Sequence, residues 1–555
     1  MIVYKLKNKK NLVWILICFI LLFSEYFFFR NIIGSNKLIG DRGDGRLTML
    51  ITEHWFNFFK GKEKFGELVI FYPAANVLAY SDMLFFYGII HSLFRFIGID
   101  IFNAYKYTII SIHFIGTLSM YYLLFHKLKL NIIWSLFGVT AFSFSSTYAT
   151  HLAHTQLCAC SMLPILLIFL INFFENLNKR KKRNVYAFLT ITWYLLILYN
   201  SWYIAFFTVV FILIFTIICI IGLLMQKKKI LKILYDFIIK VNTDIIIYVV
   251  YITILLIPFV KLYLPLLKKG GYDFSNIKSI YIPKLIALIN IGEDNWLLGN
   301  FMRYLQSLQK PTSEWNMGFS LILLSTFIIF SIFYTNKKRK TTFEYIISYL
   351  IIAVFVGMLF SIKISSKKIS LWYFIYKLIP GASSVRAVSR YLLYLSFPMA
   401  ILSSIVGNFL FNTYNFKNTN YKKYIPICLF IFLWISNIRN EGVYSTWNSS
   451  FEKEYLSGVS KPDIQCKVFY MSNTNSEVPQ YIYQLDAFEI ANKFELKTIN
   501  GYSGNIPDSW QDIWEVSNEN YENGVSNWII LNNLKNVCRY DVANNKWFIY
   551  NKTGF

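Results

Sequence analysis

The chain of 555 residues is 56% hydrophobic and only 15% charged, whereas soluble domains carry about 25% charged residues. A single water-soluble fold cannot bury this much apolar surface, because hydrophobic cores stop growing at about 250–300 residues. The composition therefore excludes an ordinary soluble enzyme, a disordered chain and a small disulfide-rich scaffold. It indicates a polytopic membrane protein.

The net charge of +25 is unevenly distributed along the chain. Residues 438–555 contain 10 basic and 14 acidic side chains, so the positive excess lies entirely in residues 1–437. There the lysines and arginines stand in short clusters between apolar runs, which is the pattern of cytoplasmic loops. We therefore expect a lipid bilayer around this part of the chain, and no nucleic-acid partner.

Eleven apolar runs are predicted to cross the membrane as helices, since a bilayer core needs about 20 helical residues. They are residues 11–29, 103–125, 131–149, 157–174, 184–200, 203–225, 238–260, 316–334, 343–361, 391–411 and 424–437. No small-residue cleavage site follows the first run, so we expect it to be retained rather than removed as a signal peptide. Every second loop is basic, which places the N-terminus inside and the C-terminal tail outside.

Two domains are expected. Residues 1–437 form the transmembrane domain, whose first outside loop covers residues 30–102, and residues 438–555 form an extracytoplasmic domain. The tail is predicted to be a small α/β or mainly β unit, because strand-like runs alternate with turn signals. These runs are residues 467–471, 528–531 and 546–550, with a helix around 484–494.

Two of the seven cysteines, Cys466 and Cys538, lie in this tail. They are able to pair if the tail is outside the cell, where disulfides persist, but the sequence leaves their pairing open. Cys158 and Cys160 have no matching second pair, so we interpret them as core residues and not as metal ligands.

Acidic residues are scarce in the membrane domain, and seven of its 16 lie between positions 41 and 100. The first outside loop begins Gly40-Asp41-Arg42-Gly43-Asp44-Gly45-Arg46. Its glycines permit a tight turn and a close approach of a ligand to the backbone. Two carboxylates flanked by arginines are able to keep one base ionised near a phosphate; the alternative is a solvated polar loop.

Later in the same loop, Ser81 and Asp82 precede a short apolar run at residues 83–97. The run is too short to span a bilayer, so we predict an interfacial or re-entrant helix. Ser81 or Asp82 is expected near its N-cap, a role that would need no catalytic function.

The topology and several short motifs together resemble the GT-C superfamily of integral membrane glycosyltransferases. The motifs are G-D-x-G-D-G-R-L at 40–47, E-H-W at 53–55, Y-P-x-x-N at 72–76, S-D at 81–82, H-x-x-H-x-Q at 151–156, P-G-x-x-x-x-R-x-x-x-R at 380–390 and the tail segment 500–507. The resemblance covers nearly the whole chain and implies a GT-C-like α-helical fold of about eleven transmembrane helices.

The resemblance also implies an activity: transfer of a sugar from a polyprenyl-phosphate-linked donor to an envelope glycan, lipid or protein outside a bacterial plasma membrane. An acidic residue of the first outside loop would be the general base on the acceptor hydroxyl, in a reaction that generally inverts the anomeric carbon. Asp44 is the position carried over, and Asp41 is the close alternative.

The remaining candidate residues fall into two groups. A phosphate leaving group needs cationic or donor stabilisation, and Arg386 and Arg390 are four apart, as on one face of a helix. The candidates for donor binding are Arg386, Arg390, Arg46, His151, His154 and Gln156. The candidates for acceptor or sugar binding are Glu53, His54, Asp82, Tyr72 and Asn76.

No cofactor is expected, and a divalent metal ion is the less favoured alternative. His151 and His154 are three apart and would bind a metal only if a carboxylate joined them. Two other functions stay open: a transporter or flippase of lipid-linked sugars, and a polymerase of such sugars. A transporter would show an internal repeat and polar residues along a path through the spans, and the sequence shows neither.

Overall fold

The computed structural model describes residues 2–226, 230–267, 270–308, 314, 316–335, 341–364, 370–413, 424–438 and 444–550. Its helices are α1 (Ile2–Phe28), α2 (Asp44–Phe59), α3 (Phe85–Phe96), α4 (Ile101–Tyr122), α5 (Ile132–Ser143), α6 (Ser146–His151), α7 (Leu163–Glu175), α8 (Arg180–Asn200), α9 (Trp202–Met225), α10 (Ile230–Leu267), α11 (Phe274–Asn276), α12 (Gly299–Ser307), α13 (Leu321–Thr335), α14 (Thr342–Phe360), α15 (Trp372–Leu378), α16 (Tyr391–Thr413), α17 (Ile425–Ile438), α18 (Ser450–Gly458), α19 (Gln480–Phe494) and α20 (Tyr521–Leu531). The strands are β1 (Lys37–Ile39), β2 (Thr446–Asn448), β3 (Val468–Ser472), β4 (Lys497–Thr498), β5 (Val537–Asp541) and β6 (Lys546–Ile549).

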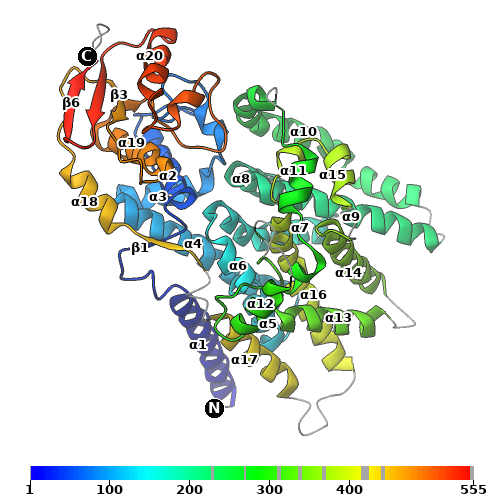
Figure 1. Cartoon of the computed structure of the whole chain (residues 1–555). Coiled ribbons are helices and arrows are strands. Elements are labelled where there is room, and N and C mark those ends of the chain that lie inside the picture. Colours follow the sequence, from blue (N-terminus) through cyan, green and yellow to red (C-terminus); the bar gives the residue numbers. More distant parts are fainter. Residues whose placement is uncertain are drawn as a thin grey trace.

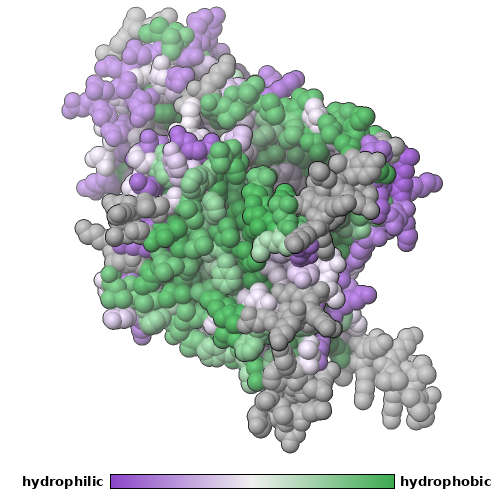
Figure 2. Space-filling model, turned by 90° about the vertical axis from the view of Figure 1, so that its right-hand side faces the viewer, coloured by the Kyte–Doolittle hydropathy of each residue, from purple (hydrophilic) through white to green (hydrophobic). Residues whose placement is uncertain are grey.

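Each predicted apolar run overlaps a helix, because a helix satisfies its own backbone hydrogen bonds where lipid offers no partner. Residues 131–149 are divided between α5 and α6, and residues 157–174 between a 3₁₀ helix (Thr155–Met162) and α7. Seven described segments are long and apolar enough to cross a membrane: Ile101–Lys127, Ile132–His151, Thr155–Glu175, Trp202–Met225, Asp244–Leu267, Thr342–Phe360 and Val388–Thr413. The runs at 11–29, 184–200, 316–334 and 424–437 are not among these described candidate spans, so the predicted number of eleven is not confirmed. Figure 2 shows a broad hydrophobic surface over the helices, with hydrophilic side chains gathered toward its margins. The fold is therefore mostly helical and compatible with a membrane protein.

Burial separates inner helices from outer ones. The apolar parts of α5 and α16 are mostly buried inside the protein, whereas almost none of the apolar part of α10 is. Two buried carboxylates within the helices are paired, as expected where an isolated charge is costly. Glu25 of α1 is hydrogen-bonded to His113 of α4 at 2.8 Å, and Asp244 of α10 forms ion pairs with Arg180 and Arg183 of α8.

The tail forms an α/β unit that sits at one end of the helical bundle beside α2 and α3 (Figure 1). Its four-stranded sheet has the order β4-β3-β5-β6, in which β3 runs parallel to β4 and β5, and β6 is antiparallel to β5. A disulfide joins Cys466 and Cys538 beside this sheet. Strand β2, at the start of the tail, pairs antiparallel with β1 of the first loop.

One predicted strand of the tail is wrong. Residues 528–531 belong to α20, which runs through Asn523-Gly524, the pair interpreted as a turn. Tyr521, Val525 and Trp528 are buried on this helix, a spacing close to four residues that is helical and not strand-like. The predicted strands at 467–471 and 546–550 correspond to β3 and β6, and the predicted helix corresponds to α19.

Candidate functional site

The first residue of helix α2 is Asp44, and its carboxylate is held from two sides. One oxygen lies 3.0 Å from Nδ1 of His154, which follows α6, and the other accepts a hydrogen bond of 3.1 Å from the hydroxyl of Tyr502 in the tail. The side chain is still 37% exposed. Asp44 is thus a reachable carboxylate at the contact between the helical domain and the tail.

Two glycines allow this loop to fold so tightly. Gly40 has a φ of +101°, and a Cβ built on it would lie 2.8 Å from the Cα of Gly45. A side chain at either position would push the two backbone segments apart. The carbonyl of Ile39 just before this turn accepts a hydrogen bond from Tyr105 of α4, which also donates to Thr155 beside His154. The turn and the tyrosine together bring Asp44 next to His154.

Asp41 has a different role from Asp44. Its Oδ1 accepts hydrogen bonds from the backbone N–H groups of Gly43 and Gly45, at 3.0 and 3.1 Å. These are groups at the start of α2 that the helix itself leaves without a partner. The geometry therefore favours Asp41 as a support for the helix start and Asp44 as the carboxylate available for chemistry.

Glu314 and Arg390 extend the site beyond His154. Nε2 of His154 lies 3.5 Å from a carboxylate oxygen of Glu314, and both oxygens of Glu314 accept from Arg390, at 2.6 and 2.7 Å. Arg390 ends a short 3₁₀ helix, η7 (Val388–Arg390), that leads into α16, and its side chain is only 5% exposed. Negative and positive groups therefore alternate in the order Asp44, His154, Glu314, Arg390.

The charges of this cluster shift the pKa values of its members. Burial by itself would raise the pKa of Asp44, but the hydrogen bond and charge of His154, with the hydroxyl of Tyr502, hold it below its ordinary value. The pKa of Glu314 is likewise lowered against the effect of burial, chiefly by Arg390. Burial would lower the pKa of His154, but the two carboxylates raise it. Asp44 is therefore an ionised acceptor at neutral pH.

Arg386 is not placed as the sequence predicts. It lies in an irregular segment before η7, so the expectation that Arg386 and Arg390 share one helical face is wrong. The Arg386 guanidinium is exposed and stacks on the rings of Tyr281 and Tyr272, at 5.0 and 5.5 Å from their centres. Its backbone N–H and that of Ala387 donate to the hydroxyl of Tyr203. Arg386 thus stays available to an anion at the surface, whereas Arg390 is engaged by Glu314.

Arg46 is not available to a phosphate, which corrects its predicted role in donor binding. The side chain is completely buried, and it forms ion pairs of 2.6 Å with Asp486 and 2.7 Å with Glu489 of α19. Both partners are themselves nearly buried. Arg46 therefore joins α2 to the tail domain, two residues after Asp44.

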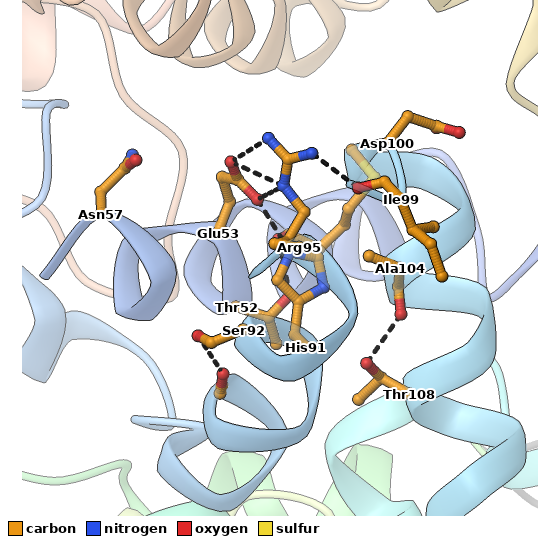
Figure 3. Close-up of polar contacts among 12 residues, drawn as sticks. Thr52, Glu53, Asn57, His91, Ser92, Arg95, Ile99, Asp100, Ala104 and Thr108 are labelled. Atoms are coloured by element: carbon orange, nitrogen blue, oxygen red, sulfur yellow. Dashed lines mark hydrogen bonds and ion pairs between the residues drawn. The ribbon is translucent and has the colours of Figure 1, made fainter. Parts of the chain in front are cut away.

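Glu53 and His54 lie in a separate cluster farther along α2. Glu53 accepts from His91 at 2.8 Å and from Arg95 at 2.9 Å, both on α3 (Figure 3). His54 is paired with Glu63 at 2.5 Å. Since a helix rises about 1.5 Å per residue, Glu53 is about 13 Å along α2 from Asp44. Glu53 thus holds α2 on α3, and His54 holds α2 to the loop that follows it; neither joins the Asp44 cluster.

His151 and Gln156 flank His154 without contacting Asp44. Nδ1 of His151 is hydrogen-bonded to the carbonyl of Thr147, and its Nε2 is buried with no hydrogen-bond partner in the described part of the chain. The side-chain oxygen of Gln156 is buried without a partner in the same way. Within the described residues, no group of three His, Cys, Asp or Glu side chains is arranged to hold a metal ion.

Asp82 caps α9, not α3, which corrects the predicted cap. Its carboxylate accepts from the backbone N–H of Trp202 at 2.9 Å, while residue 84 precedes α3. Burial raises the pKa of Asp82 to about 6, although the N–H of Trp202 and the charge of Arg390 act in the opposite direction. Asp82 therefore lies near the cluster but is committed to a backbone contact.

Tyr72 and Asn76 do not contact the Asp44 cluster. The backbone of Tyr72 exchanges hydrogen bonds with the tail: its N–H donates to the carbonyl of Thr498, and its carbonyl accepts from Trp528. Asn76 is exposed, with a φ of 56°, at the start of the short 3₁₀ helix η1 (Val77–Tyr80). Tyr72 therefore attaches the first loop to the tail.

Comparison with known proteins adds no family to this geometry. The chain matches no protein-family model, and a search of curated proteins finds no relative. The functional argument therefore rests on the residues of the site.

Sequence reasoning missed Glu314 and Tyr502. Tyr502 stands in the tail segment 500–507 that was noticed for its resemblance, but nothing local points it at Asp44. A signal for Glu314 did exist: it is one of only 16 acidic residues in the first 437 and lies outside the apolar runs.

Proposed function

We propose that this protein is a membrane glycosyltransferase that moves a sugar from a polyprenyl-phosphate donor to a hydroxyl of an envelope acceptor outside the cell. The observation that carries the proposal is the Asp44 carboxylate, which is ionised, partly exposed and held between His154 and Tyr502. It stands at the start of α2 in the loop whose motifs resemble the GT-C enzymes.

In the proposed reaction, Asp44 accepts the proton of the acceptor hydroxyl as the hydroxyl oxygen attacks the anomeric carbon. The bond between that carbon and the phosphate oxygen breaks, and polyprenyl phosphate leaves with the electron pair. Attack opposite the leaving group inverts the anomeric centre. General-base help of this kind is worth about 10²–10⁴-fold in rate.

The leaving phosphate needs positive charge, which Arg386 and Arg390 supply in this proposal. The exposed Arg386 would meet the phosphate first. Arg390 is reached only if its bidentate pair with Glu314 opens or accommodates a third group. His154 keeps Asp44 oriented through Nδ1 while its other nitrogen faces Glu314.

The proposed orientation places the tail outside a bacterial plasma membrane and the N-terminus inside. The disulfide between Cys466 and Cys538 supports this assignment, because disulfides are stable in oxidising compartments and rare in the cytoplasm. The alternation of basic loops along the sequence agrees with it.

The test compares Asp44→Asn with Asp41→Asn in purified protein in nanodiscs. A panel of undecaprenyl-phosphate sugars is supplied with envelope extract, and release of undecaprenyl phosphate is measured. Asp44→Asn should lose about 10²–10⁴-fold in rate. Asp41→Asn should keep most activity, because an amide oxygen still accepts from the N–H groups of Gly43 and Gly45. No release from any donor by intact protein, or full activity of Asp44→Asn, would overturn the proposal.

A further inference from the structure

A hollow of about 670 Å³ opens in the tail domain, in the segment that follows Tyr502. Residues 503–509, Gln511 and Trp514 line it, and we refer to it as the 503–514 hollow. The residue before this segment is Tyr502, whose hydroxyl donates to Asp44. The hollow and the proposed base are therefore connected through a single side chain.

The wall of the hollow is firmly held. Gln484 of α19 is completely buried and joins both ends of the segment: its side-chain oxygen accepts from the N–H of Gly501 at 2.8 Å, and its amide nitrogen donates to the carbonyls of Ile513 and Trp514. Trp510, also fully buried, donates to the carbonyl of Ile499. A surface fixed in this way loses little conformational entropy when a ligand binds.

A group of aromatic rings connects the hollow with Asp44. The ring of Trp514, which lines the hollow, is stacked on that of Tyr502, with centres 6.1 Å apart and planes 26° apart, and the centre of the Tyr481 ring lies 5.9 Å from that of Tyr502. All three side chains are partly exposed. Such rings present a flat apolar face with a polar edge, which suits a ligand that has both C–H faces and hydroxyl groups.

The polar groups of the hollow select against an anion. The nine lining residues include no lysine or arginine, and they include Asn505, Asp508 and Gln511. A lipid phosphate would meet the carboxylate of Asp508 and no lysine or arginine among these nine described residues. An acyl or prenyl chain would meet too many polar groups, since an unsatisfied polar group against hydrocarbon is costly.

We propose that the 503–514 hollow binds the acceptor of the reaction, and that this acceptor is a neutral carbohydrate. A sugar ring stacked on Trp514 and Tyr502 would place its hydroxyl near Asp44, while the exposed amides bond the other hydroxyls. This inference rests on the proposed function for its use of Asp44, but binding of a neutral sugar is measurable without any turnover.

The experiment uses the full chain in nanodiscs and four neutral disaccharides as probes: chitobiose, cellobiose, maltose and mannobiose. A glucuronate-containing disaccharide serves as the anionic probe, and saturation-transfer NMR measures binding. We expect a neutral probe to bind and Trp514→Ala to weaken it about tenfold or more, since a lost aromatic contact costs that much. Trp514→Phe should retain most binding. The matched control is Phe451→Ala on α18, an aromatic side chain that is 65% exposed.

Three results would overturn the inference: no neutral disaccharide binds, the anionic probe binds better, or Trp514→Ala binds as wild type while its thermal unfolding is unchanged. Release of undecaprenyl phosphate is measured on the same samples. Asp44-dependent release without a Trp514-dependent sugar site would overturn the inference and leave the proposed function standing. Sugar binding at Trp514 without release from any donor would support the site and overturn the proposed function.

Discussion

Replacing Arg46 separates two interpretations of the first outside loop. As a phosphate ligand, Arg46 would affect the donor and leave the fold intact. In the structure, however, its fully buried guanidinium is bound to Asp486 and Glu489 of the tail. We therefore expect Arg46→Met to destabilise the contact between α2 and α19.

The loss of stability expected for Arg46→Met follows from the burial of the ion pairs. Methionine fills a similar volume, but it leaves two buried carboxylates without their cation. Breaking a buried ion pair by removing one partner costs about 3–5 kcal/mol, and every 1.4 kcal/mol or so is a factor of ten in an equilibrium constant. Burial already raises the pKa of Asp486 and of Glu489 although Arg46 opposes it. Without Arg46 both pKa values should rise further, and protonation would relieve the repulsion.

These raised pKa values determine how the stability of Arg46→Met changes with pH. A carboxyl group whose pKa is higher in the folded than in the unfolded state favours folding below its unfolded pKa, and the advantage is lost as the pH rises through the folded pKa. The free energy of unfolding of Arg46→Met should therefore fall further below wild type at pH 8 than at pH 5.

Thermal unfolding of the full chain in nanodiscs, followed by tryptophan fluorescence at both pH values, measures this effect. The compensating variant is Arg46→Met with Asp486→Asn and Glu489→Gln, which removes all three charges and should recover much of the lost stability. Equal stability of Arg46→Met and wild type, together with a raised KM for the donor, would refute the structural role and restore phosphate binding. A triple variant no more stable than the single one would refute the charge argument.

Three further predictions concern the site and the tail. His154→Gln removes the main group that lowers the pKa of Asp44, so the pH below which kcat/KM falls should move upward. Glu314→Gln removes the carboxylate that positions both Arg390 and His154, and we expect transfer to fall at least about tenfold, since hydrogen bonds to a charged group are worth about 1.5–3 kcal/mol. Replacing Cys466 and Cys538 by serine opens a link between positions 72 residues apart, which should cost the tail about 4 kcal/mol in thermal unfolding.

Each of these predictions has a control or a contrary result. Glu293→Gln is the control for Glu314, because Glu293 lies in the same outside loop but is half-exposed. Equal losses of activity in both variants would contradict a specific role for Glu314. If the pH below which kcat/KM falls is the same in His154→Gln as in wild type, another group controls the ionisation of Asp44. Unchanged tail stability in the serine variant would show that sheet and helix packing suffice.

The sequence predicted a mostly helical fold, because apolar runs long enough to cross a membrane are recognised from the local sequence alone. A run of about 20 apolar residues indicates a membrane helix without reference to the rest of the chain. The orientation that the basic clusters indicate stays a prediction. The tail was harder, since strand and helix compete in short apolar runs. Residues 528–531 show the difficulty. They were interpreted as a strand, but they are the end of helix α20, whose buried residues Tyr521, Val525 and Trp528 follow a helical spacing.

The sequence predicted individual residues of the site from local motifs, but not the contacts between them. Asp44, His154 and Arg390 were selected individually, and the structure brings them into one chain of contacts. The partner of Arg46 could not be found, because Asp486 is 440 positions away and no local pattern refers to it. The four-residue spacing of Arg386 and Arg390 gave a wrong prediction, because it matches an α-helical face but the chain is irregular at Arg386 and forms only a short 3₁₀ helix up to Arg390.

The contacts around Asp44 make the tail a part of the proposed active site. Tyr502 donates to the base, Arg46 fixes α2 on α19 two residues later, and β1 pairs with β2 just before the loop turns. Unfolding of the tail would remove all three contacts at once. The disulfide of the tail should therefore make activity depend on an oxidising environment, because a stable tail is what holds Asp44 in place.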